Sequence, residues 1–311
     1  MQKVLVTCPP MLGLIDEFHE YANSLNLSLE SVKVTQTLSK DKLIEIVPSY
    51  DGWIIGDDPA CREVLIAGKK GKLKGAVKWG IGIDNVDLET CEKINLKITN
   101  TPNMFGSEVA DISMGYVIGL ARQTFFIDRE VRSFKWPKPV GMSLKGKTAG
   151  VIGYGDIGRK TSARLLASEM NVIAYDPFIN KKLLLEGVSH QKWPIRLNEC
   201  DFLIINCSLT KSSFHLLNKE SFKLVKTGVN IVNVGRGAII EQKSLISAIK
   251  NKIVNSVALD VFEEEPLENL SPLRKFDNCI FGSHNASNTK EAVIKTSIQS
   301  IKILKSFLDS K

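Results

Sequence analysis

Short apolar runs alternate with amphipathic stretches along the chain, and this alternation is the main guide to its secondary structure. In the first part of the chain the pattern predicts strands at 3–6, 28–34, 52–55, 76–79 and 97–100. It predicts helices at 12–26, 40–46, 59–66 and 87–94. Strands that alternate with helices in this way indicate an α/β unit built on a parallel sheet.

The alternation resumes after a long helical pattern at 107–122. Strands are predicted at 149–153, 171–174, 202–206, 230–233, 256–258 and 278–281, with helices between them. A last helical pattern at 290–308 is expected to return to the first unit. We therefore predict an α/β fold with two doubly wound parallel-sheet domains, in which 101–286 is inserted between 1–100 and 287–311.

The composition agrees with a globular protein of two domains. The chain has 311 residues, of which 43% are hydrophobic and 24% are charged, and this excludes disordered and collagen-like proteins. No apolar run is long enough to span a bilayer, and the first residues are typical of a strand rather than of a signal peptide. We expect a cytoplasmic protein with no membrane partner.

Charge and cysteine content narrow the possible partners. The formal charge of +7 comes from lysines spread along the chain, and the densest group, at 69–74, is typical of a solvated loop, so no nucleic-acid partner is expected. A positive field would attract small anionic ligands. The six cysteines form no C-x-x-C pair and have no neighbouring histidines, so we expect neither a metal site nor disulfides.

A glycine pattern after the strand at 149–153 predicts a dinucleotide site. Gly153 permits a tight turn, Gly155 lets a pyrophosphate approach the backbone, and Gly158 allows the helix to pack closely on the strand. Asp176 ends the next strand, where an acid accepts the ribose hydroxyls and repels a 2′-phosphate. The preceding strand and the placed acid argue against a chance glycine turn. The cofactor is therefore predicted to be NAD rather than NADP, although the lysines at 181–182 leave the strictness of that preference open.

Three chemically active side chains follow later strands. His284 comes after the strand at 278–281, Arg236 lies between two glycines after 230–233, and Asp260 follows 256–258. Ligands bind outside the carboxyl ends of parallel strands, so an imidazole, a guanidinium and a carboxylate there predict an acid/base site. His19 lies in a helical segment, and His190 and His215 lie in polar stretches typical of connections, so no catalytic role is expected for them.

These motifs resemble those of the D-isomer-specific 2-hydroxyacid dehydrogenase family, which includes phosphoglycerate dehydrogenases and glyoxylate/hydroxypyruvate reductases. The resemblance covers nearly the whole chain. It rests on the fingerprint at 153–176, on Gly-Ile-Gly-Ile-Asp-Asn-Val-Asp at 80–87, and on the segments 100–102, 233–237, 258–266 and 284–289. It implies a Rossmann NAD domain inserted into a flavodoxin-like substrate domain, and interconversion of a small D-2-hydroxyacid and its 2-ketoacid.

The resemblance assigns catalytic roles to three residues. Arg236 would bind the substrate carboxylate and polarise the keto oxygen, and His284 would donate a proton to that oxygen during reduction and remove it during oxidation. Glu265, just before Pro266, would orient the imidazole and favour its protonated form. The neighbours Glu263 and Glu264 are expected to be solvated.

Binding residues follow from the same resemblance. Cofactor contacts are implied for Gly153, Gly155, Asp156, Ile157, Gly158, Asp176, Cys207, Val234, Gly235, Asp260 and Asn285. The backbone N–H groups of Ile81 and Gly82 would bind the substrate carboxylate from the other domain, which would close over the substrate and exclude water. A homodimer through the NAD domain is also implied, with the helix after Ser107 and the segment around Trp136 as its interface.

Two departures from the family pattern bear on the substrate. Asn285 replaces an apolar residue, where its amide either contacts the ligand or makes a neutral loop contact. Asp57 and Asp58 stand where some phosphoglycerate-binding relatives carry an arginine, which disfavours a phosphate, although Lys78 offers a cation in the neighbouring loop. A 3-phosphoglycerate or sugar-acid dehydrogenase therefore remains an alternative. An NAD-sensing corepressor is another, although it would not require Arg236, Glu265 and His284 together.

Overall fold

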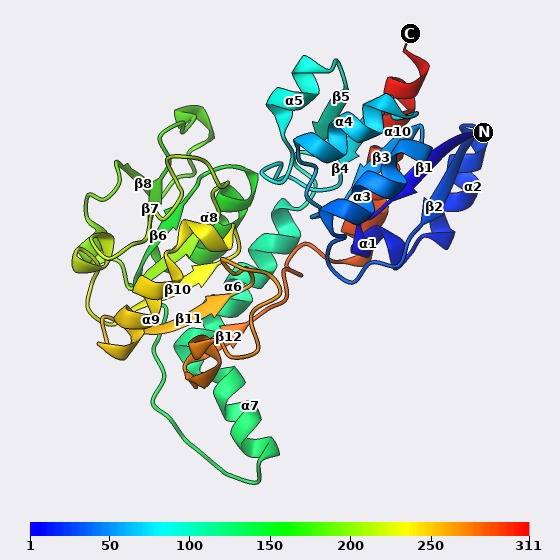
Figure 1. Ribbon diagram of the computed structural model, residues 1–311. Coiled ribbons are helices and arrows are strands. Elements are labelled where there is room, and N and C mark those ends of the chain that lie inside the picture. Colours follow the sequence, from blue (N-terminus) through cyan, green and yellow to red (C-terminus); the bar gives the residue numbers. More distant parts are fainter. Residues whose placement is uncertain (311) are drawn as a thin grey trace. The chain divides into compact units, whose positions relative to one another are not determined.

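The chain divides into two compact units in this computed structural model, which describes residues 1–310 (Figure 1). Unit 1 comprises Met1–Met104 and the segment from Asn288 onward, and unit 2 comprises Phe105–Ser287. Each unit is a parallel sheet with helices packed on it, so the predicted α/β fold with two parallel-sheet domains is confirmed.

Unit 1 contains a parallel sheet in the order β2-β1-β3-β4-β5. Its strands are β1 (Gln2–Val6), β2 (Leu27–Ser31), β3 (Gly52–Ile55), β4 (Gly75–Lys78) and β5 (Lys97–Asn100). Its helices are α1 (Pro9–Leu12), α2 (Asp16–Ser24), α3 (Lys40–Ile46), α4 (Arg62–Lys70), α5 (Leu88–Lys93) and α10 (Lys290–Asp309). Helix α10 packs on β3 and β4, while α3 and α4 pack together on the opposite face. Strand β3 is covered on both faces, which explains why Trp53, Ile54 and Ile55 are all fully buried.

Unit 2 contains a parallel sheet in the order β12-β11-β10-β9-β6-β7-β8. Its strands are β6 (Thr148–Ile152), β7 (Asn171–Tyr175), β8 (Val188–Gln191), β9 (Phe202–Ile205), β10 (Val229–Asn233), β11 (Val254–Leu259) and β12 (Cys279–Phe281). Its α-helices are α6 (Gly106–Arg122), α7 (Thr124–Arg132), α8 (Asp156–Ala167) and α9 (Gln242–Lys250). Helices α6 and α8 pack against each other, and α9 packs on β11.

Several predicted elements need correction. The helix predicted at 12–26 is interrupted, because α1 ends at Leu12 and α2 begins at Asp16. Strand β8 and helix α7 were not predicted: β8 is a polar edge strand, and α7 buries none of its residues, so neither carries a strong apolar pattern. His190 accordingly lies in β8 and not in a connection. Between β9 and β10, within the described chain, the expected helix is replaced by a short 3₁₀ turn, Ser221–Lys223.

The strand register of unit 2 brings the ends of its central strands to one edge of the sheet. Ile152 pairs with both Tyr175 and Ile205, and Asn233 pairs with both Ile205 and Leu259. Leu259 in turn pairs with Phe281. Because all these strands are parallel, the residues that follow them gather at the same carboxyl edge, where ligands of doubly wound sheets bind.

Candidate active site

The turn after β6 has the shape that a pyrophosphate requires. Gly153 has φ +90°, and a side chain there would collide with the backbone of Cys207. A Cβ on Gly158 would lie 2.0 Å from the carbonyl oxygen of Gly153, so only glycine allows α8 to approach the strand. A Cβ on Gly155 would meet nothing within 4 Å, which leaves open space beside the first-turn N–H groups of α8. This open turn fits a dinucleotide.

Asp156 and Ile157 begin α8, with their backbone at this turn. The Asp156 carboxylate lies 3.2 Å from the ammonium group of Lys160 one helical turn later, so its charge is balanced by a neighbour. The backbone N–H groups of the first turn have no carbonyl partner within the helix and are the donors suited to an anion.

Asp176 lies directly after β7 and organises the loop beside it. Its Oδ2 accepts a hydrogen bond from the N–H of Tyr154 at 2.7 Å, and its Oδ1 accepts one from the N–H of Phe178 at 2.8 Å. The carboxylate thus ties the end of β7 to the glycine turn. Each oxygen keeps further lone-pair capacity for a ribose hydroxyl.

Cys207 follows β9 and packs against Gly153. Burial raises the pKa of its thiol to about 11, so the thiol is protonated at neutral pH and serves as a packing surface rather than a nucleophile. The six cysteines are all free thiols.

The turn that carries Arg236 is held by the buried side chain of Asn233. The Asn233 amide donates to the carbonyl oxygen of Arg236 at 3.0 Å and accepts from the N–H of Gly235 at 3.0 Å. Val234 is nearly buried, and a Cβ on Gly235 would come within 2.8 Å of the carbonyl oxygen of Cys207. The guanidinium of Arg236 is half-buried, and its Nη1 donates to the carbonyl oxygen of Gly235.

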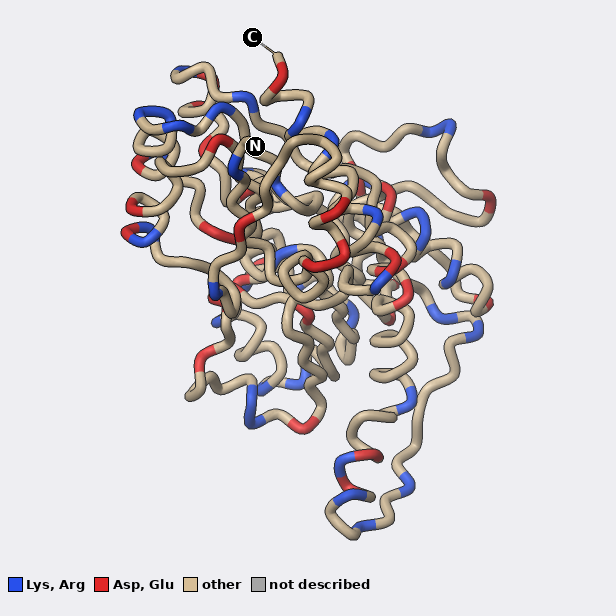
Figure 2. The backbone as a smooth tube through the Cα atoms, turned by 90° about the vertical axis from the view of Figure 1, so that its right-hand side faces the viewer, with Lys and Arg blue, Asp and Glu red and all other residues tan. Residues whose placement is uncertain are grey.

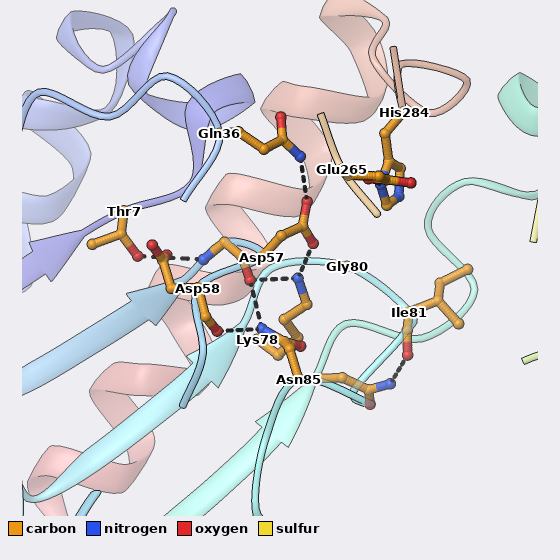
Figure 3. A network of polar contacts seen from close by, with 12 residues as sticks. Thr7, Gln36, Asp57, Asp58, Lys78, Gly80, Ile81, Asn85, Glu265 and His284 are labelled. Atoms are coloured by element: carbon orange, nitrogen blue, oxygen red, sulfur yellow. Dashed lines mark hydrogen bonds and ion pairs between the residues drawn. The ribbon is translucent and has the colours of Figure 1, made fainter. Parts of the chain in front are cut away.

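His284 and Glu265 form a close pair at the same edge. The His284 Nδ1 lies 2.7 Å from the Glu265 Oε2, and each side chain is 23% exposed. The other Glu265 oxygen accepts a hydrogen bond from the N–H of Phe262 at 2.9 Å, which fixes the carboxylate. Figure 3 shows the two side chains facing each other. A fixed carboxylate on one ring nitrogen orients the ring and favours its protonated form.

Asp260 is buried behind the turn that carries His284. The residue is 2% exposed, and its carboxylate accepts from the hydroxyl of Tyr116 and from the N–H groups of Asn285 and Ala286. The expectation that Asp260 lies beside the cofactor stays a prediction. Asn285 is exposed on the same turn, and its contact with a ligand also stays a prediction.

Glu263 is exposed, as expected of a solvated neighbour, but it is also paired with His215. Glu263 Oε1 lies 2.5 Å from the His215 Nε2, and its Oε2 accepts from the N–H of Gln242 at the start of α9. The His215 ring also stacks on Phe214. This second histidine–glutamate pair ties the loop after β9 to the segment that contains Glu265.

The position and the charge environment of Lys78 differ from those predicted. It lies on β4 rather than in a loop, and its side chain is 3% exposed. It donates to the carbonyl oxygen of Gly56 and to the Asp57 carboxylate at 2.8 Å, and Gln36 donates to the same carboxylate (Figure 3). The cation is therefore already paired with a protein carboxylate.

Ile81 and Gly82 lie in the half-buried loop after β4. The carbonyl oxygen of Ile81 accepts from Asn100, and Gly80, with φ +133°, donates its N–H to Thr101. These bonds hold the loop in one shape.

A group of three or more His, Cys, Asp or Glu side chains placed to hold a metal ion is absent from residues 1–310, and within the same range no helix is long and apolar enough to cross a membrane.

The sequence reasoning missed Tyr116, Asn233 and His215 as supports of this edge. Tyr116 lies on the buried face of a helix, where its spacing marks it only as part of the apolar face. A buried tyrosine hydroxyl and a buried asparagine amide each require a partner, and that requirement is the signal that could have identified them.

Comparisons with known proteins agree with this geometry. Residues 114–286 match the family model "D-isomer specific 2-hydroxyacid dehydrogenase, NAD binding domain". The chain is 34% identical to a D-3-phosphoglycerate dehydrogenase of Archaeoglobus fulgidus over 93% of its own length, but it spans only 54% of that protein. It is 33% identical to a hydroxypyruvate reductase of Thermotoga maritima, with 91% of this chain and 94% of the relative covered.

A solved structure of similar fold is the apo form of D-lactate dehydrogenase from Escherichia coli, with a TM-score of 0.82 and 29% identity. That match covers 96% of this chain and 95% of the other. The chain belongs to the D-isomer specific 2-hydroxyacid dehydrogenase family, and most of unit 2 matches the NAD binding domain of that family.

Proposed function

We propose that the protein is an NAD-dependent oxidoreductase that interconverts a small D-2-hydroxyacid and its 2-ketoacid. The observation that carries the proposal is the His284–Glu265 pair at 2.7 Å, on the same sheet edge as Arg236 and the open glycine turn. One edge thus holds a proton donor, a carboxylate-binding cation and a dinucleotide turn, which are the groups that this reaction needs.

The catalytic roles follow from the chemistry of each side chain. Arg236 binds the substrate carboxylate through its planar guanidinium and draws electron density from the keto oxygen. His284 donates a proton to that oxygen during reduction and accepts it back during oxidation. Glu265 holds the ring through Nδ1 and stabilises the imidazolium before transfer.

The proposed NAD contacts lie along the unit 2 edge. The first-turn N–H groups at Asp156 and Ile157 bind the pyrophosphate beside Gly153, Gly155 and Gly158, and Asp176 binds the ribose. Cys207, Val234, Gly235, Asp260 and Asn285 are assigned to the remaining cofactor surface. The bound nicotinamide supplies or accepts the hydride, and the protein orients the reactants.

The substrate is proposed to be unphosphorylated. Lys78 is buried and its charge is balanced by Asp57, so this cation is not available for a phosphate, and the Asp57 carboxylate, 37% exposed, would repel one. The N–H groups of Ile81 and Gly82 are proposed to bind the substrate carboxylate. Asn285 is proposed to contribute to specificity.

We also propose that the chain forms a homodimer through unit 2. Helix α7 and the stretch 134–145 project from the rest of this unit (Figure 1), with Phe134, Trp136 and Val140 strongly exposed. Such an apolar projection is typical of a surface covered by a partner. Figure 2 shows several lysine and arginine positions along the same projection.

A cytoplasmic location is proposed because the six cysteines are free thiols, as a reducing compartment favours.

The direct test is NADH consumption, followed by absorbance, with glyoxylate, hydroxypyruvate, pyruvate, bulkier 2-ketoacids and 3-phosphohydroxypyruvate. The proposal predicts turnover of at least one unphosphorylated ketoacid and weak or no turnover of the phosphorylated one. Saturable NADH binding without turnover of any 2-ketoacid would contradict the enzymatic function and favour a sensor. A preference for 3-phosphohydroxypyruvate would contradict the assigned substrate class.

A further inference from the structure

Tyr116 lies under the turn that carries His284, although it belongs to helix α6. Its side chain is 8% exposed, and its hydroxyl donates to the Asp260 Oδ1 at 3.3 Å. Helix α6 packs on β11 and β12, the strands that precede Asp260 and His284. Burial, followed by the nearby Asp260 charge, raises the pKa of the Tyr116 hydroxyl, which therefore stays protonated and acts as a donor.

Oxygen atoms of Asp260 accept hydrogen bonds from the backbone N–H groups of three consecutive residues of that turn. Its carbonyl oxygen accepts from the N–H of His284 at 2.7 Å, its Oδ1 accepts from the N–H of Asn285 at 3.3 Å, and its Oδ2 accepts from the N–H of Ala286 at 2.9 Å. A carboxylate that accepts several backbone N–H bonds is a strong anchor, because each bond is charge-assisted.

The anchored turn has an unfavourable backbone shape. His284 has φ +57°, a left-handed conformation that is unfavourable for a residue with a Cβ. Such a conformation persists when surrounding bonds determine it. The Asp260 bonds surround His284 in this way, since they hold its own N–H and the N–H groups of the two residues after it.

Gly282 makes room for the Tyr116–Asp260 contact. A Cβ at this position would lie 2.0 Å from the Asp260 Oδ1 and 2.5 Å from the Tyr116 hydroxyl oxygen. The absence of a side chain at 282 is therefore a condition for the hydrogen bond between these two residues.

We propose that Tyr116 is a positioning residue for His284: its hydroxyl fixes the Asp260 carboxylate, which holds the left-handed turn that presents the imidazole to Glu265. The inference rests on the proposed acid/base role of His284 and adds a residue on a different element to the support of that role. Tyr116 itself contacts none of the reacting groups.

Tyr116→Phe tests this with little change in packing, since it removes only the hydroxyl. The imidazolium loses part of its contact with Glu265 when the turn loosens, so the His284 ring should release its proton at lower pH. The ring titration, followed by NMR without substrate, is expected to move to lower pH, with the His284 signal assigned by its loss in His284→Gln. The turnover number should fall about tenfold.

Tyr175→Phe is the matched control. Tyr175 is also buried in unit 2, and its hydroxyl donates to the carbonyl oxygen of Ile195 at 2.9 Å, in a different part of the unit. It should lower thermal stability about as much as Tyr116→Phe does, without moving the His284 titration. Gly282→Ala should move that titration in the same direction as Tyr116→Phe, because the new methyl group separates Tyr116 from Asp260.

An unchanged His284 titration in Tyr116→Phe would overturn the inference, as would an equal shift in Tyr175→Phe. The titration is read without substrate or turnover. A wild-type protein that turns over no 2-ketoacid would therefore contradict the proposed function, while a shifted titration in Tyr116→Phe would still support the positioning role.

Discussion

His284 Nδ1 lies 2.7 Å from Glu265 Oε2, although the two residues are 19 positions apart and follow different strands. The Glu265 carboxylate is itself fixed by the N–H of Phe262. The Nδ1 atom is thus bound to a carboxylate of fixed position, and the proposed proton transfer to the substrate uses Nε2.

Glu265→Gln should change the pH dependence of ketoacid reduction. Reduction needs the protonated imidazole, and the carboxylate stabilises that form, so a neutral amide allows the proton to leave at lower pH. We expect the alkaline fall in turnover to move down by about one pH unit. The measurement is turnover against pH for the parent and the variant, and coincident profiles would remove Glu265 from the acid/base pair.

Asp176→Asn should weaken the discrimination against NADPH. The amide oxygen can still accept one backbone hydrogen bond in this loop, whereas the charge that repels a 2′-phosphate is lost. The ratio of kcat/KM for NADH to that for NADPH is expected to fall about tenfold. An unaltered ratio would show that Asp176 does not contact the ribose.

Asp58→Asn should stabilise the protein in a pH-dependent way. Burial raises the pKa of Asp58, against the opposing hydrogen bond from the Leu38 N–H. Below the ordinary pKa the carboxyl is protonated in both the folded and the unfolded chain. As the pH rises, Asp58 ionises first in the unfolded chain, because its pKa is lower there. The free energy of unfolding therefore decreases with pH until Asp58 also ionises in the folded chain.

Asparagine does not ionise, so the decrease in stability with rising pH that Asp58 causes should disappear in Asp58→Asn. Its melting temperature is expected to exceed that of the parent by about 2–4 °C at pH 8 and to match it at about pH 4, as measured by calorimetry. A difference of the same size at both pH values would show that Asp58 ionisation does not limit stability.

Replacement of Phe134 and Trp136 by serine should separate the proposed dimer. Both side chains are strongly exposed on the projection after α7, and their removal takes apolar contact area from a partner without disturbing buried packing. Light scattering after size exclusion should give the mass of two chains for the parent and of one chain for the variant. A monomeric parent would rule out the dimer, and a dimeric variant would place its interface elsewhere.

Much of the fold follows from local patterns, since the fully buried strands have continuous apolar runs such as 202–205 and the glycine turn follows the first strand of unit 2. Strand β8 and helix α7 were not predicted from the sequence, because they bury few side chains and their residues lack the periodicity that a core imposes. The pairing of Lys78 with Asp57 and of His215 with Glu263 depends on which loops meet in space. Spacing along the chain does not contain that information.

The assignment of Arg236, Glu265 and His284 came from their positions at strand ends and from motif resemblance. Asn233 and Tyr116 were missed as supports because their role appears only when hydrogen-bond partners are counted across strands. The left-handed conformation of His284 was likewise not predicted, because the enrichment of histidine in that region is too weak to place it.

The acid/base role of His284 is tested most directly by single-turnover reduction of a 2-ketoacid with bound NADH, compared between the parent and His284→Ala. We expect the rate of the chemical step to fall about a hundredfold or more while the dissociation constant for NADH stays within about twofold. A variant that reduces the ketoacid at nearly the parental rate would contradict the acid/base role of His284.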